Sequence, residues 1–189
     1  PPRSSAPASQ NRTLLDPDDA LRALQAAVRP SDVVLATTGY TGRALYALED
    51  RPNQLYMVGS MGCVSSLALG LALTRPERRV IALDGDGAVL MRMGALATLG
   101  AEAPPNLVHV LLDNGVHEST GAQSSVSHTA DLALVAAACG YPQVLRPQTP
   151  QEFRDAIADP EPGLRFVHLR TTLRKSTQLP RPTITPAEV

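Results

Sequence analysis

Short, continuously apolar runs recur along the chain and alternate with windows of helical periodicity. The clearest runs are residues 32–37, 79–84, 106–113 and 164–169, and weaker ones lie at 55–58 and 142–145. Such runs are typical of strands that are buried on both faces of a parallel sheet. Apolar residues at helical spacing occupy the intervals, at 41–48, 63–73, 88–100, 131–139 and 150–158. The alternation predicts an α/β fold, in which a mostly parallel, six-stranded sheet carries helices on both faces.

The ordered body of the chain is predicted to span residues 13–175. Asp16 is placed to cap a first helix, and Pro17 occupies its first position, where proline is favoured. Residues 1–12 are rich in Ser, Pro and Ala, and residues 176–189 contain several prolines. Segments of this composition rarely contribute to a core. We therefore expect a flexible N-terminal tail at 1–12 and a C-terminal tail or docking arm at 176–189.

The composition argues against several classes of function. The 189 residues carry a net charge of −1, and aromatic residues make up 3% with no Trp. This balance offers neither the basic surface nor the stacking platform of a nucleic-acid-binding protein. No apolar run in the sequence reaches the roughly 18 residues that a membrane span needs, and Cys63 and Cys139 do not make a disulfide framework. We expect a cytoplasmic protein that binds neither nucleic acid nor membranes.

Glycine-rich and polar segments follow the predicted strands, at the edge where parallel sheets bind ligands. They are residues 37–42 (TTGYTG), 59–62 (GSMG), 84–87 (DGDG) and 113–121 (DNGVHESTG). Gly85 and Gly87 flank Asp86 at the start of a predicted helix, where free N–H groups favour a phosphate. The last glycine of a dinucleotide-binding motif is missing. A carboxylate inside a phosphate-binding turn would repel its ligand unless a cation lay between them, so the motif indicates a metal.

Asp86 and Asn114 are separated by the length of one crossover. A helix of about 13 residues runs back roughly 20 Å, and a strand of six or seven residues returns the same distance. The two side chains are therefore expected side by side. Their oxygens, with a loop carbonyl such as that of Val116, two phosphate oxygens and a water, would complete an octahedral Mg²⁺ sphere. Either residue alone is equally well explained as a helix cap or a turn former, whereas the pair indicates a metal site.

The run Gly85-Asp86-Gly87, followed by 25 residues and Asp113-Asn114, resembles the thiamine diphosphate motif of decarboxylases and transketolase-like enzymes. The resemblance implies that Asp86, Asn114 and the carbonyl of Val116 hold the Mg²⁺ that binds the diphosphate. It also implies cofactor contacts from neighbouring residues, namely Gly85, Gly87 and Ala88. The family has Asn at the position of Asp113, which is not an expected metal ligand.

A second segment, Gly59-Ser60-Met61-Gly62, is similar to the one that carries the bulky apolar residue under the cofactor. By this resemblance Gly59 and Ser60 contact the cofactor, the Gly59 carbonyl accepts a hydrogen bond from its amine, and Met61 forces it into a V shape. Met61 is otherwise explained as a flexible core residue. Related enzymes contact the diphosphate with residues that correspond here to Thr38, Gly39 and Thr41; a simple turn with a helix cap is the alternative for each.

The narrowest resemblance is to the phosphonopyruvate decarboxylase and sulfopyruvate decarboxylase family. It is carried by residues 37–39, 58–62, 84–98 and 112–123 and spans roughly 32–141. It implies a lyase of phosphonate biosynthesis that converts 3-phosphonopyruvate to phosphonoacetaldehyde and CO2. The alternatives are 3-sulfopyruvate or another 2-keto acid as substrate, carboligation, a non-catalytic cofactor-binding module, and an α/β domain for some other phosphate ligand.

His117 and Ser119 follow the predicted metal loop and are the candidate catalytic residues. A histidine that titrates near neutrality can bind an anion or relay a proton. The alternative for His117 is a loop histidine satisfied by solvent, and for Ser119 it is a turn residue.

The resemblance also implies a glutamate that protonates the cofactor's pyrimidine ring and lies on a separate, upstream pyrimidine-binding domain. Only Glu118 among the glutamates of this chain is near the predicted site, and it lies on the diphosphate side. We therefore expect a pyrimidine-binding, alpha-type partner subunit, as in the split members of the family. The two would form a hetero-oligomer with a shared active site for a small anionic 2-keto acid.

Overall fold

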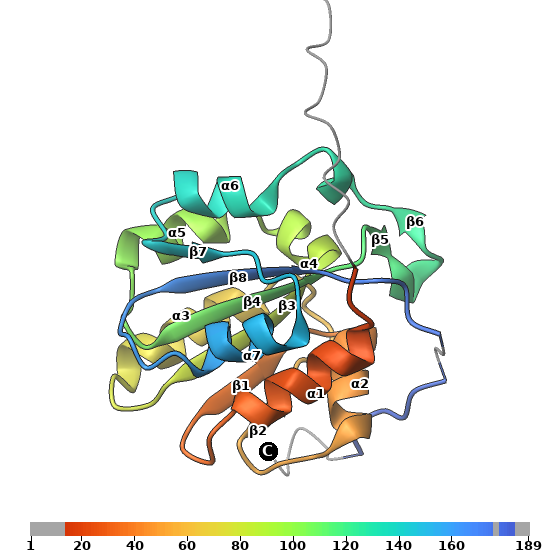
Figure 1. Ribbon diagram of the computed structural model, residues 1–189, viewed down its shortest axis with the longest axis horizontal. Helices are drawn as coiled ribbons and strands as arrows, with labels where there is room; N and C mark the ends of the chain where they lie inside the picture. The colour runs from red at the N-terminus through yellow and green to blue at the C-terminus, as the bar shows by residue number, and fades with distance from the viewer. Residues whose placement is uncertain (1–13, 176–177, 184–189) are drawn as a thin grey trace, which may run out of the picture.

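The computed structural model describes residues 14–175 and 178–183 (Figure 1). The tail predicted at 1–12 lies outside the described residues, and the arm predicted at 176–189 lies outside them except for 178–183. Within the described ranges, no helix is long and apolar enough to cross a membrane.

In the described part of the chain, six strands form one sheet in the order β2-β1-β3-β4-β8-β7, and every neighbouring pair is parallel. The strands are β1 (Val33–Ala36), β2 (Gln54–Tyr56), β3 (Val80–Gly85), β4 (Leu107–Asp113), β7 (Gln143–Leu145) and β8 (Arg165–Arg170). All six were predicted from the apolar runs, and the fold class is confirmed. The central strands β3 and β4 are buried on both faces, which explains why they are largely apolar rather than alternating.

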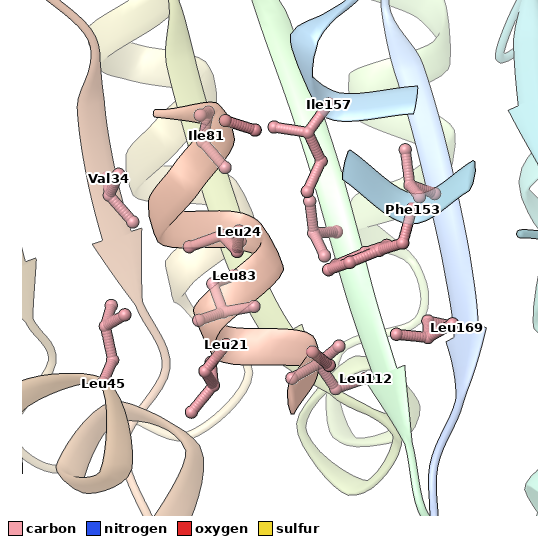
Figure 2. Packing of buried hydrophobic residues seen from close by; sticks show 14 of the residues in the cluster. Leu21, Leu24, Val34, Leu45, Ile81, Leu83, Leu112, Phe153, Ile157 and Leu169 are labelled. Carbon is pink, nitrogen blue, oxygen red and sulfur yellow. The ribbon is translucent and has the colours of Figure 1, made fainter. Parts of the chain in front are cut away.

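Helices cover the two faces of the sheet. They are α1 (Pro17–Ala27), α2 (Tyr40–Leu48), α3 (Val64–Thr74), α4 (Asp86–Met91), α5 (Ala95–Glu102), α6 (Leu132–Ala138) and α7 (Pro150–Ala158). One buried cluster joins α1, α2 and α7 to alternate residues of the strands, and Figure 2 shows Leu21, Leu24 and Phe153 of this layer against Ile81 and Leu83. A second cluster joins α3, α4, α5 and α6 to the opposite face. The period-two alternation of strand side chains divides each strand between the two clusters.

The start of α1 follows its sequence prediction. The Asp16 carboxylate accepts a hydrogen bond from the Asp18 N–H (2.9 Å), and Pro17 is the first helical residue. This cap satisfies one of the N–H groups that lack a partner inside the helix. Leu21 and Leu24 are thereby directed into the core, where at most 1% of each is exposed.

The prediction of one continuous helix at 88–100 is wrong, because the structure has two helices there. α4 ends at Met91, and Arg92 has φ −134° and ψ 43°, well outside the helical region. Its N–H closes a tight turn onto the Val89 carbonyl (3.2 Å). Gly94, which costs about 1 kcal/mol relative to Ala inside a helix, instead stands at the N-cap of α5.

Strand order reverses between β1 and β3, because β2 lies on one side of β1 and β3 on the other. The carboxyl ends of strands at such a switch point diverge into loops that leave a crevice, where doubly wound sheets bind ligands. The segments after β1, β3 and β4 therefore meet at one edge of the sheet.

Candidate functional site

A pocket lies at the carboxyl ends of β1, β3 and β4. Most of the residues singled out from the sequence line it: Thr38, Gly39, Thr41, Met61, Gly85, Asp86, Gly87, Ala88, Asn114, Val116, His117 and Ser119. Gly59 lines an adjoining pocket, which shares residues 37–40 and Ser119 with the first. Ser60 lines neither of these pockets. Segments far apart in the sequence are thus brought together by the parallel register of the sheet.

The register of β3 and β4 places Asp86 and Asn114 close together. Gly85 is paired with Leu112, so Asp86 is level with Asp113, and Asn114 is one residue further along. The Asn114 side-chain oxygen accepts a hydrogen bond from the Val116 N–H (3.1 Å), which forms a turn typical of Asn. Its Nδ2 donates to Oε2 of Glu118 (3.1 Å). Both the oxygen and the nitrogen of the Asn114 side-chain amide are therefore hydrogen-bonded.

The Asp86 carboxylate is 3% exposed and accepts hydrogen bonds from two serines that the sequence analysis did not single out. Ser125 Oγ donates to Oδ2, and Ser127 Oγ lies 3.3 Å from the same atom. Burial raises the pKa of Asp86; the Ser125 hydrogen bond opposes this shift, and the nearby charge of Asp113 adds to it. A cation beside Asp86 would relieve this cost of burying a charge.

Asp113 is completely buried and fully engaged with the protein. Its Oδ1 accepts from Ser127 Oγ (2.8 Å), and its Oδ2 lies 2.8 Å from Nε2 of His168 and 3.1 Å from Nη1 of Arg170. Burial acts to raise the pKa of Asp113, but the hydrogen bonds from His168 and Ser127 and the charge of Arg170 outweigh it and hold the pKa below its usual value. Both oxygens point into this network rather than toward a ligand.

The sequence analysis missed this network, which consists of Ser125, Ser127, His168 and Arg170 around Asp113. His168 lies on β8, and its ring is paired with the Asp113 carboxylate. The feature of the sequence that could have revealed this network is Asp113, which stands where the family has Asn. A carboxylate at the end of a buried strand requires charged partners, although the sequence does not say which.

The segment from Gly59 to Gly62 has an unusual backbone. Gly59, Ser60 and Gly62 have φ values of +68°, +48° and +86°, which are left-handed and rare for a residue such as serine. A Cβ at Gly62 would lie 2.8 Å from the carbonyl oxygen of Ala88, so the loop approaches α4 closely. Met61, half-buried between these residues, lines the pocket, and its Cε lies 3.8 Å from the Cβ position of Gly39.

The imidazole of His117 lies against Gly87. A Cβ at Gly87 would be 2.5 Å from Nδ1 of His117, which is closer than atoms can approach. His117 belongs to a hairpin that the sequence analysis did not predict, formed by β5 (Val116–His117) and β6 (Gln123–Ser124). Ser119 is exposed and lines both pockets. The hairpin therefore brings both candidate catalytic residues to the pocket.

The donors in this pocket fit one class of metal. Among the described residues, no group of three or more His, Cys, Asp or Glu side chains is arranged to hold a metal by itself. The available oxygens are the Asp86 carboxylate, the Asn114 amide and the Val116 carbonyl. Mg²⁺ is commonly held by one or two carboxylates and completes its shell with waters and phosphate oxygens. The residues present therefore fit a magnesium ion that shares a phosphate ligand.

Comparison with known families decides the cofactor class. The family model described as "Thiamine pyrophosphate enzyme, C-terminal TPP binding domain" matches residues 37–168, well over half of the chain. The chain belongs to the thiamine pyrophosphate enzyme family. The matched region contains every residue that lines the first pocket. The resemblance inferred from the sequence motifs is confirmed.

Individual relatives indicate which thiamine pyrophosphate enzymes the chain resembles. The chain is 48% identical over 172 residues to a phosphonopyruvate decarboxylase of Streptomyces viridochromogenes, covering 90% of this chain and 43% of that protein. It is 44% identical over 131 residues to a sulfopyruvate decarboxylase subunit beta of Methanothermobacter thermautotrophicus, covering 69% of this chain and 70% of that protein. The chain thus spans less than half the length of the first relative and most of the second.

The solved structures agree in fold. A thiamine diphosphate-dependent 4-hydroxybenzoylformate decarboxylase of Rhodococcus jostii superposes with a TM-score of 0.72 at 21% identity. The superposition covers 93% of this chain and 36% of that one. The parallel sheet and its helical layers are therefore a fold that this chain shares with part of that structure.

Proposed function

We propose that the chain is the diphosphate- and Mg²⁺-binding part of a thiamine diphosphate-dependent 2-keto acid decarboxylase. The proposed reaction converts 3-phosphonopyruvate to phosphonoacetaldehyde and CO2. The observation that carries the proposal is the convergence of Asp86, Asn114 and Val116 on one pocket with Met61 on its wall. The identity of 48% to a phosphonopyruvate decarboxylase supports the choice of substrate.

In this proposal, Asp86, the Asn114 side-chain oxygen and the Val116 carbonyl hold Mg²⁺, and the metal binds the diphosphate. The backbone around α4 and after β1 contacts the diphosphate through Gly85, Gly87, Ala88, Thr38, Gly39 and Thr41. Gly59, Ser60 and Met61 would contact the pyrimidine side of the cofactor. The bound cofactor supplies the nucleophilic carbon and the electron sink for loss of CO2.

His117 and Ser119 are proposed to contact the substrate. The ring of His117 lies close to Gly87 on the wall of the first pocket. An imidazole N–H there would bind the substrate anion, and an imidazolium there would donate a proton to the product carbon and become neutral. Ser119 adds a hydroxyl donor on the side that joins the two pockets.

The acid that protonates the pyrimidine is proposed to come from a pyrimidine-binding partner subunit. Glu118 is the only glutamate on the first pocket's wall within the described residues. Its two oxygens accept hydrogen bonds from Asn114 and from the Arg174 N–H (2.9 Å), which ties it to the metal loop. The name "subunit beta" given to three relatives supports a split enzyme.

A second candidate substrate is 3-sulfopyruvate. It is favoured by the match to sulfopyruvate decarboxylase subunit beta, of which the chain covers 70%. Sulfonate and phosphonate groups have similar shape and are bound by the same kinds of donors.

The proposal is tested by reconstitution. The chain is mixed with a candidate alpha-type polypeptide, thiamine diphosphate and Mg²⁺, and the aldehyde formed from 3-phosphonopyruvate, 3-sulfopyruvate or pyruvate is measured. We expect turnover only in the mixture, with 3-phosphonopyruvate the preferred substrate. Preference for 3-sulfopyruvate would select the second candidate. Normal turnover by the chain alone would contradict the partner, and cofactor binding without turnover of any keto acid would indicate a non-catalytic module.

A further inference from the structure

The segment that follows β8 returns along the edge of the sheet that carries the pocket. Thr171 forms a bridge with Leu15, and the Arg174 N–H donates to Oε1 of Glu118. The Arg174 guanidinium also forms an ion pair with Asp18 at the start of α1. In Figure 1 this part of the chain, drawn in blue, leaves β8 and passes beside α2.

Residues 178–183 are held against α2 by one arginine. Nε of Arg43 donates to the carbonyl oxygen of Pro180 (3.3 Å), and Nη2 donates to that of Leu179. Leu179 packs against the core cluster that joins α1 and α2 to the sheet. The guanidinium of Arg43 also lies 5.5 Å from the centre of the Tyr40 ring. Two bonds to successive carbonyls fix the path of this segment as well as its position.

This docking places Arg181 on the wall of the adjoining pocket. Arg181 lies there with Thr38, Gly39, Gly59 and Ser119, four of the residues singled out from the sequence. Arg181 and Arg43 are the only arginine or lysine residues that line either pocket within the described part of the chain.

The two arginines differ in their free hydrogen-bonding capacity. Nε and Nη2 of Arg43 already donate to backbone carbonyls. The Arg181 side chain is exposed and makes no hydrogen bond or ion pair with any described residue. No described residue therefore occupies its five N–H donors, which can serve a ligand in the pocket.

The charges around the first pocket favour such a cation for an anionic substrate. Asp86, Asn114 and Glu118 line it, no lysine or arginine of the described residues does, and a bound Mg²⁺ would be neutralised by Asp86 and the diphosphate. A 2-keto acid with a phosphonate or sulfonate on C3 brings at least two further negative charges. A planar guanidinium matches two oxygens of such a group with parallel N–H bonds.

We propose that Arg181 binds the phosphonate or sulfonate group of the substrate, and that Arg43 positions it by holding residues 178–183 against α2. This proposal rests on the proposed function for the class of substrate. It assigns substrate selection to the adjoining pocket and decarboxylation to the first one.

The first test measures steady-state kinetics of the complete enzyme, with partner subunit, cofactor and Mg²⁺. For Arg181→Gln we expect KM for 3-phosphonopyruvate to rise about tenfold or more. The rate with pyruvate should be unchanged, because pyruvate lacks the second anionic group. Arg181→Lys should recover part of the affinity. Arg22→Gln, which removes an exposed charge on α1, is the matched control. An equal loss with both substrates would mean a structural role and would overturn the proposal.

The second test separates this proposal from the proposed reaction, because it measures binding alone. Calorimetry on the same complex follows 3-phosphonopropionate, which has the carboxylate and the phosphonate but no keto group. We expect the wild type and Arg22→Gln to bind it and Arg181→Gln to bind about tenfold more weakly. This result in an enzyme without turnover would sustain the Arg181 assignment and reject the reaction. Equal affinity in Arg181→Gln, or no binding by the wild type, would reject the assignment.

Discussion

Nε2 of His168 lies 2.8 Å from Oδ2 of Asp113, and this contact joins β8 to the floor of the pocket. The opposite oxygen of Asp113 is bonded to Ser127, which also lies 3.3 Å from the Asp86 carboxylate. A chain of polar contacts thus connects the candidate metal ligand, Asp86, to a fully buried carboxylate that is paired with Arg170 and His168. Because Asp113 is ionised and paired, it stabilises the fold and does not compete with Asp86 for a cation.

Replacing Asp113 should destabilise the protein strongly. In Asp113→Ala the buried His168 ring, Arg170 and Ser127 lose their acceptor, and we expect the free energy of unfolding to fall by about 3 kcal/mol. Urea unfolding monitored by circular dichroism measures the change. His168→Gln should cost at least about 1 kcal/mol less in the Asp113→Ala background than in the wild type. Asp155→Ala on the exposed side of α7 is the control, and additive losses would show that the two residues are not coupled.

Replacing Asp86 should abolish metal-dependent binding while leaving the fold intact. Asp86→Asn keeps an acceptor for Ser125 but removes the buried charge, so we expect the free energy of unfolding without Mg²⁺ to be unchanged or higher. Thiamine diphosphate affinity in the presence of Mg²⁺, measured by calorimetry, should fall more than about 100-fold, since a direct ligand outweighs a supporting residue. Asp86→Ala should lose thiamine diphosphate affinity to a similar extent. Unchanged binding in both variants would refute the metal assignment.

We expect that glycine is needed at position 87 because the His117 ring leaves no room for a side chain, and not because the helix requires a glycine there. In Gly87→Ala the new methyl meets the imidazole, and we expect the free energy of unfolding to fall by about 1 kcal/mol. In the His117→Ala background the same change should stabilise by up to about 1 kcal/mol, because alanine is the better helix former. Gly70→Ala in α3, where a Cβ would meet no atom within 4 Å, is the control and should stabilise both backgrounds. The same sign for Gly87→Ala in both would contradict the contact.

The cap of α6 should make stability depend on pH. Asp131 accepts from the N–H groups of Ala133 and Leu134 and pairs with Arg146. Burial acts to raise the pKa of Asp131, but the Arg146 hydrogen bond and the cap outweigh it, so the pKa lies below the ordinary 3.8. The carboxylate therefore stabilises the fold above about pH 4, and this contribution is lost as the pH falls through the lower, folded-state pKa.

This pH dependence is tested by comparing the N-terminal caps of α6 and α7. Asp131→Ala should cost about 1 kcal/mol at pH 7, and the difference from the wild type should shrink between pH 4 and pH 2. Thr149→Ala removes the neutral cap of α7 and should cost a similar amount at both ends of this range. Urea unfolding at each pH gives both values, and a constant cost for Asp131→Ala would contradict the shifted pKa.

Local pattern was enough to predict the strands and the identity of the site segments. A strand buried on both faces must be apolar throughout, so β3 and β4 stand out from the sequence without any knowledge of their neighbours. The glycines and polar residues after them follow from the same reasoning, because ligands bind beyond the carboxyl ends of parallel strands. The expectation that Asp86 and Asn114 lie close together came from the length of one crossover, although that crossover contains two helices, α4 and α5, rather than one.

The sequence by itself therefore determined the α/β fold, the family and the segments that form the pocket. Only the tertiary structure decided which partners satisfy Asp113, where the helix after Asp86 breaks, and that residues 178–183 return to α2. These outcomes depend on contacts between groups far apart in the chain, such as Asp113 with His168 and Arg43 with Pro180. A buried charge requires some partner and an arginine some acceptor, but only the packed arrangement of the whole chain selects which one is near.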